Sequence, residues 1–207
     1  MAAVAELGSL GKEECQPQHM EPMTAARPVI LLDGTRGIVR PITPADRNAL
    51  AASFEDLESE SRMRRFLFNK NHLSDSELTR LTNPDGVNHI AYGLAVNLDD
   101  GTEEIPIAVA RCFRDEDEKD LAEIAIVTAD LWQGNGAGVE LMRSLSAAAV
   151  KVGIRRWFAA MFSDNTVIKR LLNRFGKKCE ERSLVSGIVE AIYEIVEPPG
   201  GLFDSSS

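Results

Sequence analysis

Apolar runs and polar turns alternate along the central part of the chain, which is the pattern of a layered α/β protein. Runs with the length and composition of strands, each bounded by turn residues, occupy residues 29–32, 37–40, 89–98, 105–113, 121–128, 156–162, 178–184 and 186–196. The 121–128 run is nearly all apolar, which is typical of a central strand buried on both faces. The pattern therefore predicts a sheet in which this run is an inner strand.

Capping residues and helical spacing predict helices between these runs. Thr43-Pro44-Ala45-Asp46 and Ser74-Asp75-Ser76-Glu77 each place a capping hydroxyl three positions before an acidic residue, as a helix start requires. With the apolar residues that follow, the predicted helices occupy residues 43–57, 74–82, 139–151 and 164–175. Strands and helices in this order indicate an α/β protein with a mixed sheet.

The two ends of the chain lack this periodicity. The segment before Arg27-Pro28 is polar, and the segment from Pro198-Pro199-Gly200-Gly201 onward is rich in turn formers and serine. We therefore expect a flexible N-terminal extension at 1–27, one domain at 28–197 and a flexible tail at 198–207. No sequence repeat or low-complexity linker divides the domain.

Composition narrows the range of functions. The chain has 207 residues and a formal net charge of −9, which argues against partners that bind a basic face, namely nucleic acid and anionic lipid. No apolar run approaches the roughly 20 residues of a membrane helix. Glu6, Glu13 and Glu14 stand where a signal peptide would carry basic residues, so we expect a cytoplasmic protein.

The cysteines and histidines do not indicate a metal centre. Cys15, Cys112 and Cys179 form no CxxC pair, and the three histidines lie in no cluster with the spacing of ligands. We expect no metal cofactor and reduced thiols, with Cys112 packed inside a strand. His72 and His89 are expected at the surface or in turns.

A glycine-rich turn, Gln133-Gly134-Asn135-Gly136-Ala137-Gly138, lies between the predicted strand at 121–128 and a predicted helix. The first N–H groups of a helix are unpaired and carry partial positive charge, so this arrangement favours an anion. The Gly-Lys-Ser/Thr ending of a Walker A loop is absent, because Val139 and Glu140 follow Gly138. The glycine spacing also differs from the Gly-x-Gly-x-x-Gly fingerprint of dinucleotide-binding proteins.

The turn resembles the Gln/Arg-x-x-Gly-x-Gly/Ala signature of the GCN5-related N-acetyltransferase (GNAT) superfamily. Gln133, Gly136 and Gly138 occupy its defined positions. Val39-Arg40-Pro41-Ile42-Thr43-Pro44-Ala45-Asp46 is similar to the opening strand and first helix of the family, and Asp164-Asn165 to a later strand-to-helix junction. The resemblance implies an acyl-CoA N-acyltransferase fold, with a mixed, mostly antiparallel sheet of about seven strands flanked by helices.

The resemblance also implies a cosubstrate, acetyl-CoA, and the residues that bind it. The pyrophosphate would lie on the turn formed by Gln133, Gly134, Asn135, Gly136, Ala137 and Gly138. The pantetheine arm would pair with the backbone near Ile126 and Val127, which can donate an N–H to the thioester oxygen. Asn165 is expected to touch the same arm, and it also has the residue type of a helix cap.

A narrower resemblance concerns the segment Glu60-Ser61-Arg62-Met63-Arg64-Arg65-Phe66 and the strand Leu121-Ala122-Glu123-Ile124-Ala125-Ile126-Val127. Both are similar to catalytic domains of bacterial protein-lysine acetyltransferases. The acceptor implied is an amine-bearing substrate, either a protein lysine or a small molecule. The chain is expected to act as a monomer or homodimer, with neither nucleic acid nor membrane as a partner.

Glu123 is the candidate general base. It is the sole charged residue of the 121–128 strand, and a carboxylate inside a sheet costs free energy unless it is hydrated or paired. It also matches the position of the catalytic glutamate in the protein acetyltransferases that the strand resembles. The alternative is that Glu123 faces solvent beside the acidic turn at 115–120.

A general acid is missing from the expected place. Many members of the family carry a tyrosine in the helix after Asn165, whereas this helix has none, and Tyr92 and Tyr193 are expected to pack inside other strands. A thiolate leaves without a strong acid, so the difference does not exclude catalysis. It does leave a second function open, a non-catalytic module that binds acyl-CoA. A third option, transfer of a longer acyl group, depends on the space near Ile126 and Val127.

Overall fold

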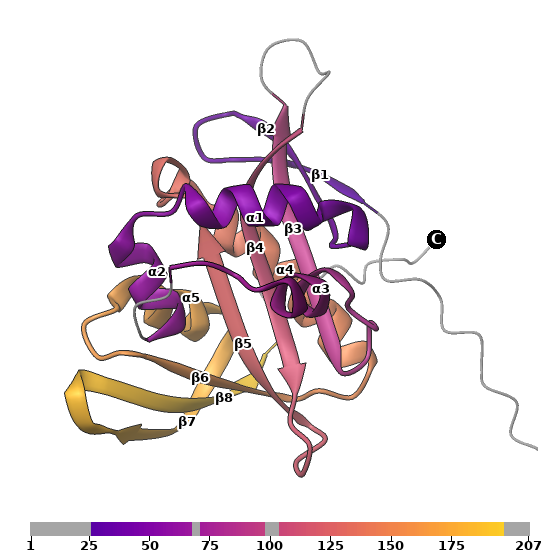
Figure 1. Ribbon diagram of the computed structural model, residues 1–207. Helices are drawn as coiled ribbons and strands as arrows, with labels where there is room; N and C mark the ends of the chain where they lie inside the picture. The colour runs from indigo at the N-terminus through magenta and orange to yellow at the C-terminus, as the bar shows by residue number, and fades with distance from the viewer. Residues whose placement is uncertain (1–25, 68–70, 98–103, 197–207) are drawn as a thin grey trace, which may run out of the picture.

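The computed structural model describes residues 26–67, 71–97 and 104–196, and these form one eight-stranded sheet with helices on both faces (Figure 1). The strands are β1 (Arg27–Ile30), β2 (Arg36–Pro41), β3 (His89–Asn97), β4 (Glu104–Arg114), β5 (Leu121–Thr128), β6 (Arg156–Phe162), β7 (Gly176–Ser183) and β8 (Ile188–Ile195). The helices are α1 (Arg47–Glu55), α2 (Ser59–Phe66), α3 (Asp75–Thr82), α4 (Ala137–Lys151) and α5 (Thr166–Phe175). Short 3₁₀ turns occupy Pro44–Asp46, Asp130–Trp132 and Val185–Gly187.

The strands follow the spatial order β1-β2-β3-β4-β5-β6-β8-β7. Every neighbouring pair is antiparallel except β5 and β6, which run parallel because α4 connects them as a crossover helix. The predicted mixed, mostly antiparallel sheet is therefore confirmed, with eight strands in the described residues where about seven were expected.

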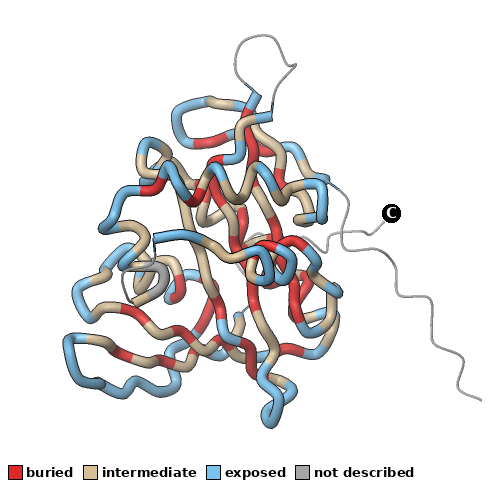
Figure 2. Tube along the Cα trace, viewed as in Figure 1, coloured by how far each residue is buried: buried red, intermediate tan, exposed pale blue. Residues whose placement is uncertain are grey.

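Helices cover the sheet in two layers. α4 packs on β3, β4 and β5, and α5 packs beside it on α4, β7 and β8. The first three helices lie on the opposite face, where α1 crosses β4 and α2 contacts β5 and β6 (Figure 1). Buried positions are concentrated along the strands and where the helices pack on them (Figure 2). The core lies mainly between α4 and the sheet, where Leu141, Met142 and Leu145 are fully buried.

The predicted helix starts are confirmed by their caps. The Ser74 hydroxyl accepts the Glu77 N–H, while the Glu77 carboxylate accepts the Ser74 N–H at 2.9 Å. The predicted 43–57 helix begins as a 3₁₀ turn at Pro44 and continues as α1. The strands predicted at 121–128 and 156–162 have the predicted bounds.

Four expectations need correction. In the strand β5 Glu123 is exposed and residues 125–128 are only half-buried, so it is not a strand buried on both faces along its whole length. Residues 59–66, for which no helix was predicted, form α2. His89 is buried and stacks on the ring of Phe113, with 4.2 Å between centroids, so it is not a surface residue. Strand β1 lies two residues before its predicted position.

The remaining outcomes concern the ends and the packing residues. Cys112, Tyr92 and Tyr193 are buried in strands, as expected, and burial raises the pKa of the Cys112 thiol to about 12. The predicted extension at 1–27 and the tail at 198–207 lie almost wholly outside the described residues, as do residues 98–103, which include the end of the strand predicted at 89–98. No helix in the described part of the chain has both the length and the apolar character that a membrane span requires.

Candidate active site

The parallel strands β5 and β6 pair over only three residues. Their register runs from Leu121, opposite Arg156, to Glu123, opposite Phe158, and ends there. Beyond this point β5 continues to Thr128 in register with β4 alone, and the two strands separate (Figure 1). The second half of β5 therefore presents a free backbone edge, the kind of edge that an extended ligand can pair with.

The hydrogen-bond pattern tells which residues of β5 face this edge. The Leu121 carbonyl accepts the Asp115 N–H, and the Ala129 N–H donates to Ile107, so odd-numbered residues direct their backbone groups toward β4. Alternation in an antiparallel pair then directs the N–H and C=O of Ile126 toward the free edge. The Val127 backbone faces β4 instead, and its side chain lies on the α1 face. Of the two residues expected to meet the pantetheine arm, only Ile126 directs its backbone N–H to the free edge of β5.

The glycine-rich turn directly precedes α4, with Gly136 at the N-cap position. Gly134 and Gly136 have φ angles of 75° and 88°, a left-handed conformation that favours glycine over residues with a Cβ. Within the described part of the chain, the N–H groups from Gly134 to Gly138 make no hydrogen bond. Five free donors at the start of a 15-residue helix are an arrangement that favours an anion, so the residues present fit a pyrophosphate.

The third glycine has a different role. A Cβ on Gly138 would lie 3.1 Å from Cδ2 of Leu171, so this glycine permits close packing of α4 against α5. Asn135 attaches the turn to the β1–β2 connection: its carbonyl accepts the Leu32 N–H at 3.1 Å, and its side-chain oxygen accepts the Asp33 N–H at 3.0 Å. The loop that would hold the anion is thus held by hydrogen bonds to the β1–β2 connection and by the packing of Gly138 against Leu171 of α5.

Gln133, the leading residue of the signature, is held by α2. Its Nε2 donates to Oδ1 of Asp130 at 2.9 Å and to the Ser61 hydroxyl at 3.3 Å. The Asp130 carboxylate also accepts the Ser61 O–H and, at 2.9 Å, the Glu58 N–H at the N-cap of α2. These three residues, named here the Ser61–Asp130–Gln133 cluster, connect α2 to the loop that follows β5.

A second connection reaches the loop that follows β6. The Arg64 guanidinium donates to Asp164 at 3.1 Å and pairs with Glu60 at 2.9 Å. These carboxylates raise the pKa of Arg64, which stays charged. The helix α2 therefore contacts both loops at the open ends of the diverging strands, although all of these groups are solvent-exposed or half-buried.

Glu123 occupies the point where β5 and β6 separate. It belongs to the last register pair of the two strands, and its side chain lies on the α1 face together with those of Ala125 and Val127. The carboxylate is exposed and makes no hydrogen bond or ion pair with any residue that the structure describes. Glu123 is therefore not a costly buried carboxylate, and its candidacy as a base rests on its position and free access.

Asn165 caps α5: its side-chain oxygen accepts the Ile168 N–H at 3.3 Å. The structure thus confirms the capping role and leaves the contact with a pantetheine arm as a prediction. Tyr92 and Tyr193 are each 1 % exposed, so neither hydroxyl is available to protonate a leaving group at the free edge of β5.

Diverging parallel strands beside a glycine-rich helix start define an acyl-CoA N-acyltransferase fold, and comparison with known proteins agrees. A family model described as the acetyltransferase (GNAT) domain matches residues 36–178. The chain belongs to this family, and the predicted membership of the GNAT superfamily is confirmed.

Individual relatives extend the match. The crystal structure of the GNAT domain of S. lividans PAT is 29 % identical, covers 82 % of this chain and 97 % of its own, and superimposes with a TM-score of 0.70. Acetyltransferase Pat of Mycolicibacterium smegmatis is 28 % identical over 159 residues, 77 % of this chain and 46 % of the relative. Acetyltransferase PA5475 of Pseudomonas aeruginosa is 28 % identical over 145 residues, 70 % of this chain and 76 % of the relative. The chain thus spans about half the length of the Mycolicibacterium protein.

The residues that join α2 to the site are not predictable from the sequence. Asp130 and Ser61 lie far apart in the sequence, and neither belongs to the glycine signature. A faint signal existed in the amphipathic spacing of 59–66, but the cap of this helix comes from Asp130, 72 residues away from Glu58. No local pattern indicates such a partner.

Proposed function

We propose that the protein transfers the acetyl group of acetyl-CoA to a primary amine by direct attack, with Glu123 as the general base. The observation that carries the proposal is the free edge of β5, which begins at Glu123 and leads to the unpaired N–H groups of the glycine-rich turn. A long, anionic thioester fits that edge, because one end of the edge offers backbone pairing and the other an anion site.

The turn and the helix start supply the binding contacts. The N–H groups of Gly134 to Gly138 would hold the pyrophosphate without a basic side chain, which explains how a chain of net charge −9 accepts an anionic donor. Asn165 would contact the pantetheine arm from the start of α5.

Ile126 and Glu123 supply the chemistry. The Ile126 N–H would donate to the thioester oxygen, where negative charge develops during attack, and one such donor contributes about 3–4 kcal/mol. Glu123 would accept a proton of the amine, directly or through a water, as the nitrogen bonds to the carbonyl carbon. The carbon–sulfur bond then breaks and CoA departs as a thiolate, which needs no tyrosine.

The acceptor that we propose is a lysine side chain of a protein. Support comes from the likeness to relatives named Pat and PAT, and from the exposed position of Glu123, which a large substrate can approach. A small-molecule amine is the alternative acceptor.

A screen that follows CoA release tests the proposal. The purified chain is incubated with acetyl-CoA and a panel of lysine-bearing proteins, peptides and small amines. Release above the acceptor-free rate, with mass spectrometry locating the acetyl group on a nitrogen, is the expected result. Binding of acetyl-CoA with no release across the panel would instead favour a non-catalytic acyl-CoA-binding module, which the missing tyrosine keeps as a second candidate.

A further inference from the structure

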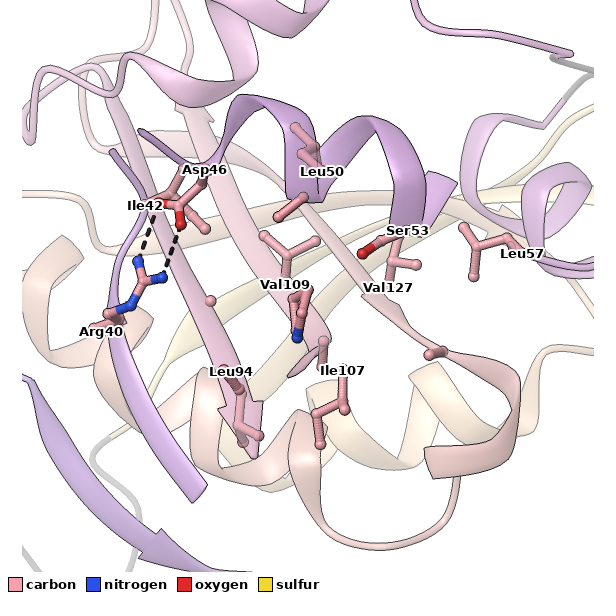
Figure 3. A pocket seen from close by; sticks show the side chains of 16 residues that line it. Arg40, Ile42, Asp46, Leu50, Ser53, Leu57, Leu94, Ile107, Val109 and Val127 are labelled. Carbon is pink, nitrogen blue, oxygen red and sulfur yellow. Dashed lines mark hydrogen bonds and ion pairs between the residues drawn. The ribbon is translucent and has the colours of Figure 1, made fainter. Parts of the chain in front are cut away.

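An apolar pocket lies between α1 and the sheet, and no step of the proposed reaction uses it (Figure 3). Its lining is mostly aliphatic, with Leu50 and Leu57 from the helical side and Ile107, Val109 and Val127 from the sheet. The pocket reaches from Val127 on β5 across β4 to Leu94 on β3, a width of about 10 Å at the usual spacing of strands.

A local irregularity of the sheet creates this space. The register of β3 and β4 shifts between Leu94, opposite Ala108, and Ala95, opposite Pro106, so Ile107 has no partner on β3. Such a bulge bends the strand and opens room beside it. Gly93, which also lines the pocket, makes room for the Ile42 side chain, because Cδ1 of Ile42 lies only 2.8 Å from where a Cβ of Gly93 would stand.

The pocket offers no free charge. Its charged lining residues, Arg40 and Asp46, pair with each other at 2.8 and 3.0 Å, and Asp46 also accepts the Thr43 N–H at 2.7 Å. Burial alone would raise the pKa of Asp46, but hydrogen bonds from Arg40 and Thr43 lower it, so the carboxyl stays ionised and paired. A cationic or anionic group placed among these aliphatic side chains would lose its hydration without gaining a partner.

The pocket lies near the end of β5 where the thioester of the donor is proposed to bind. It begins at Val127, the neighbour of Ile126, whose N–H faces the free edge of β5. Glu123 lies about 13 Å from Val127 along the strand, toward the other end of β5. An amine that gives its proton to Glu123 would therefore approach from that end of β5, whereas the pocket begins at the other end, next to Ile126.

We propose that the pocket beneath α1 receives the acyl chain of longer donors, so that the protein binds CoA thioesters of short unbranched acids, such as butyryl-CoA and hexanoyl-CoA, more tightly than acetyl-CoA. The inference rests on the proposed function, because the donor must first bind along β5. The aliphatic lining matches a chain of methylene groups, each of which gains up to about 0.8 kcal/mol on burial, equivalent to about a fourfold change in affinity.

Calorimetric binding to the full chain tests the proposal without an acceptor, using CoA, acetyl-CoA, butyryl-CoA and hexanoyl-CoA. We expect butyryl-CoA to bind about tenfold more tightly than acetyl-CoA. Ala49→Leu and Ser53→Leu, one turn apart on the pocket side of α1, should abolish this gain and leave the affinity for acetyl-CoA unchanged. Ala52→Leu, at an exposed position of the same helix, is the matched control and should keep the gain.

The outcomes separate the two proposals. If no thioester binds, the proposed function fails. If acetyl-CoA binds and butyryl-CoA binds no more tightly, the proposed function stands and the acyl pocket is wrong. The acyl pocket is also wrong if the Leu variants weaken acetyl-CoA and butyryl-CoA by the same factor, with thermal unfolding showing that the variants are folded.

Discussion

Glu123 and Phe158 form the last register pair between the parallel strands β5 and β6. Their pairing marks the vertex from which the two strands separate, and it places an exposed carboxylate at the inner end of a free backbone edge. The same edge ends near the glycine-rich turn, where five N–H groups have no partner in the described part of the chain. One strand thus connects a candidate base to a candidate anion site.

The contact between Gly138 and Leu171 predicts an energetic coupling. Adding a Cβ at position 138 requires the Leu171 side chain to move by a few tenths of an ångström, while the helix itself gains from replacing a glycine. We expect Gly138→Ala to be about 0.5–1 kcal/mol more favourable in a Leu171→Ala background than in the original chain. Chemical denaturation of the four proteins measures this difference, and equal effects in both backgrounds would show that the two residues do not meet.

The Ser61–Asp130–Gln133 cluster predicts that Asp130 stabilises α2. Asp130→Ala removes the acceptor of the Glu58 N–H and of the Ser61 hydroxyl, so the helix should lose about 1–2 kcal/mol. Hydrogen exchange of the α2 amides should become faster. Asp115→Ala is the control, since it removes a similar carboxylate from the N–H groups of Asp117 and Glu118 in the hairpin. Unchanged exchange in Asp130→Ala would contradict the assignment.

The lowered pKa of His89 should make the folded protein less stable in mild acid. Burial and the nearby Arg111 lower the pKa of its imidazole to about 4, with Arg80 acting in the same direction and Asp85 against it. Between pH 6.5 and 4 the unfolded chain binds a proton that the folded chain does not, so stability falls as the pH falls through this range.

The effect of His89 is measurable by denaturation at pH 7.5 and pH 5. We expect the original chain to lose about 1–2 kcal/mol more than His89→Phe, which keeps a ring to stack on Phe113 and removes the titrating group. If both proteins respond alike to pH, the imidazole is not neutral in the folded state.

Helix starts and strand bounds that depend only on neighbouring residues could be predicted from the sequence. The caps at Ser74 and Asn165 and the bounds of β5 and β6 follow from short patterns of polar and apolar side chains. The glycine-rich turn was recognisable because its conformation demands glycine at Gly134 and Gly136.

Features that depend on residues far apart in the chain could not be predicted from local sequence patterns. The helix α2 is polar, and its N-terminus is capped by Asp130 from another element. The burial of His89 depends on Phe113, which the β3–β4 register brings opposite it. The exposure of Glu123, which the sequence allowed only as an alternative, depends on how far the helices on the α1 face cover β5, and the apolar composition of the strand does not indicate this.

The most direct test of the role of Glu123 compares Glu123→Gln with the original chain and with Glu180→Gln, an exposed carboxylate on β7 of the same sheet. Acetyl-CoA binding and CoA release with an amine acceptor from the screen are measured from pH 6 to 10. We predict that Glu123→Gln binds acetyl-CoA normally and loses about 10²–10⁴-fold in kcat near pH 7. Part of this loss should be recovered at high pH, where the amine is already neutral, and Glu180→Gln should behave as the original chain. Near-normal turnover of Glu123→Gln across the whole pH range would contradict the account.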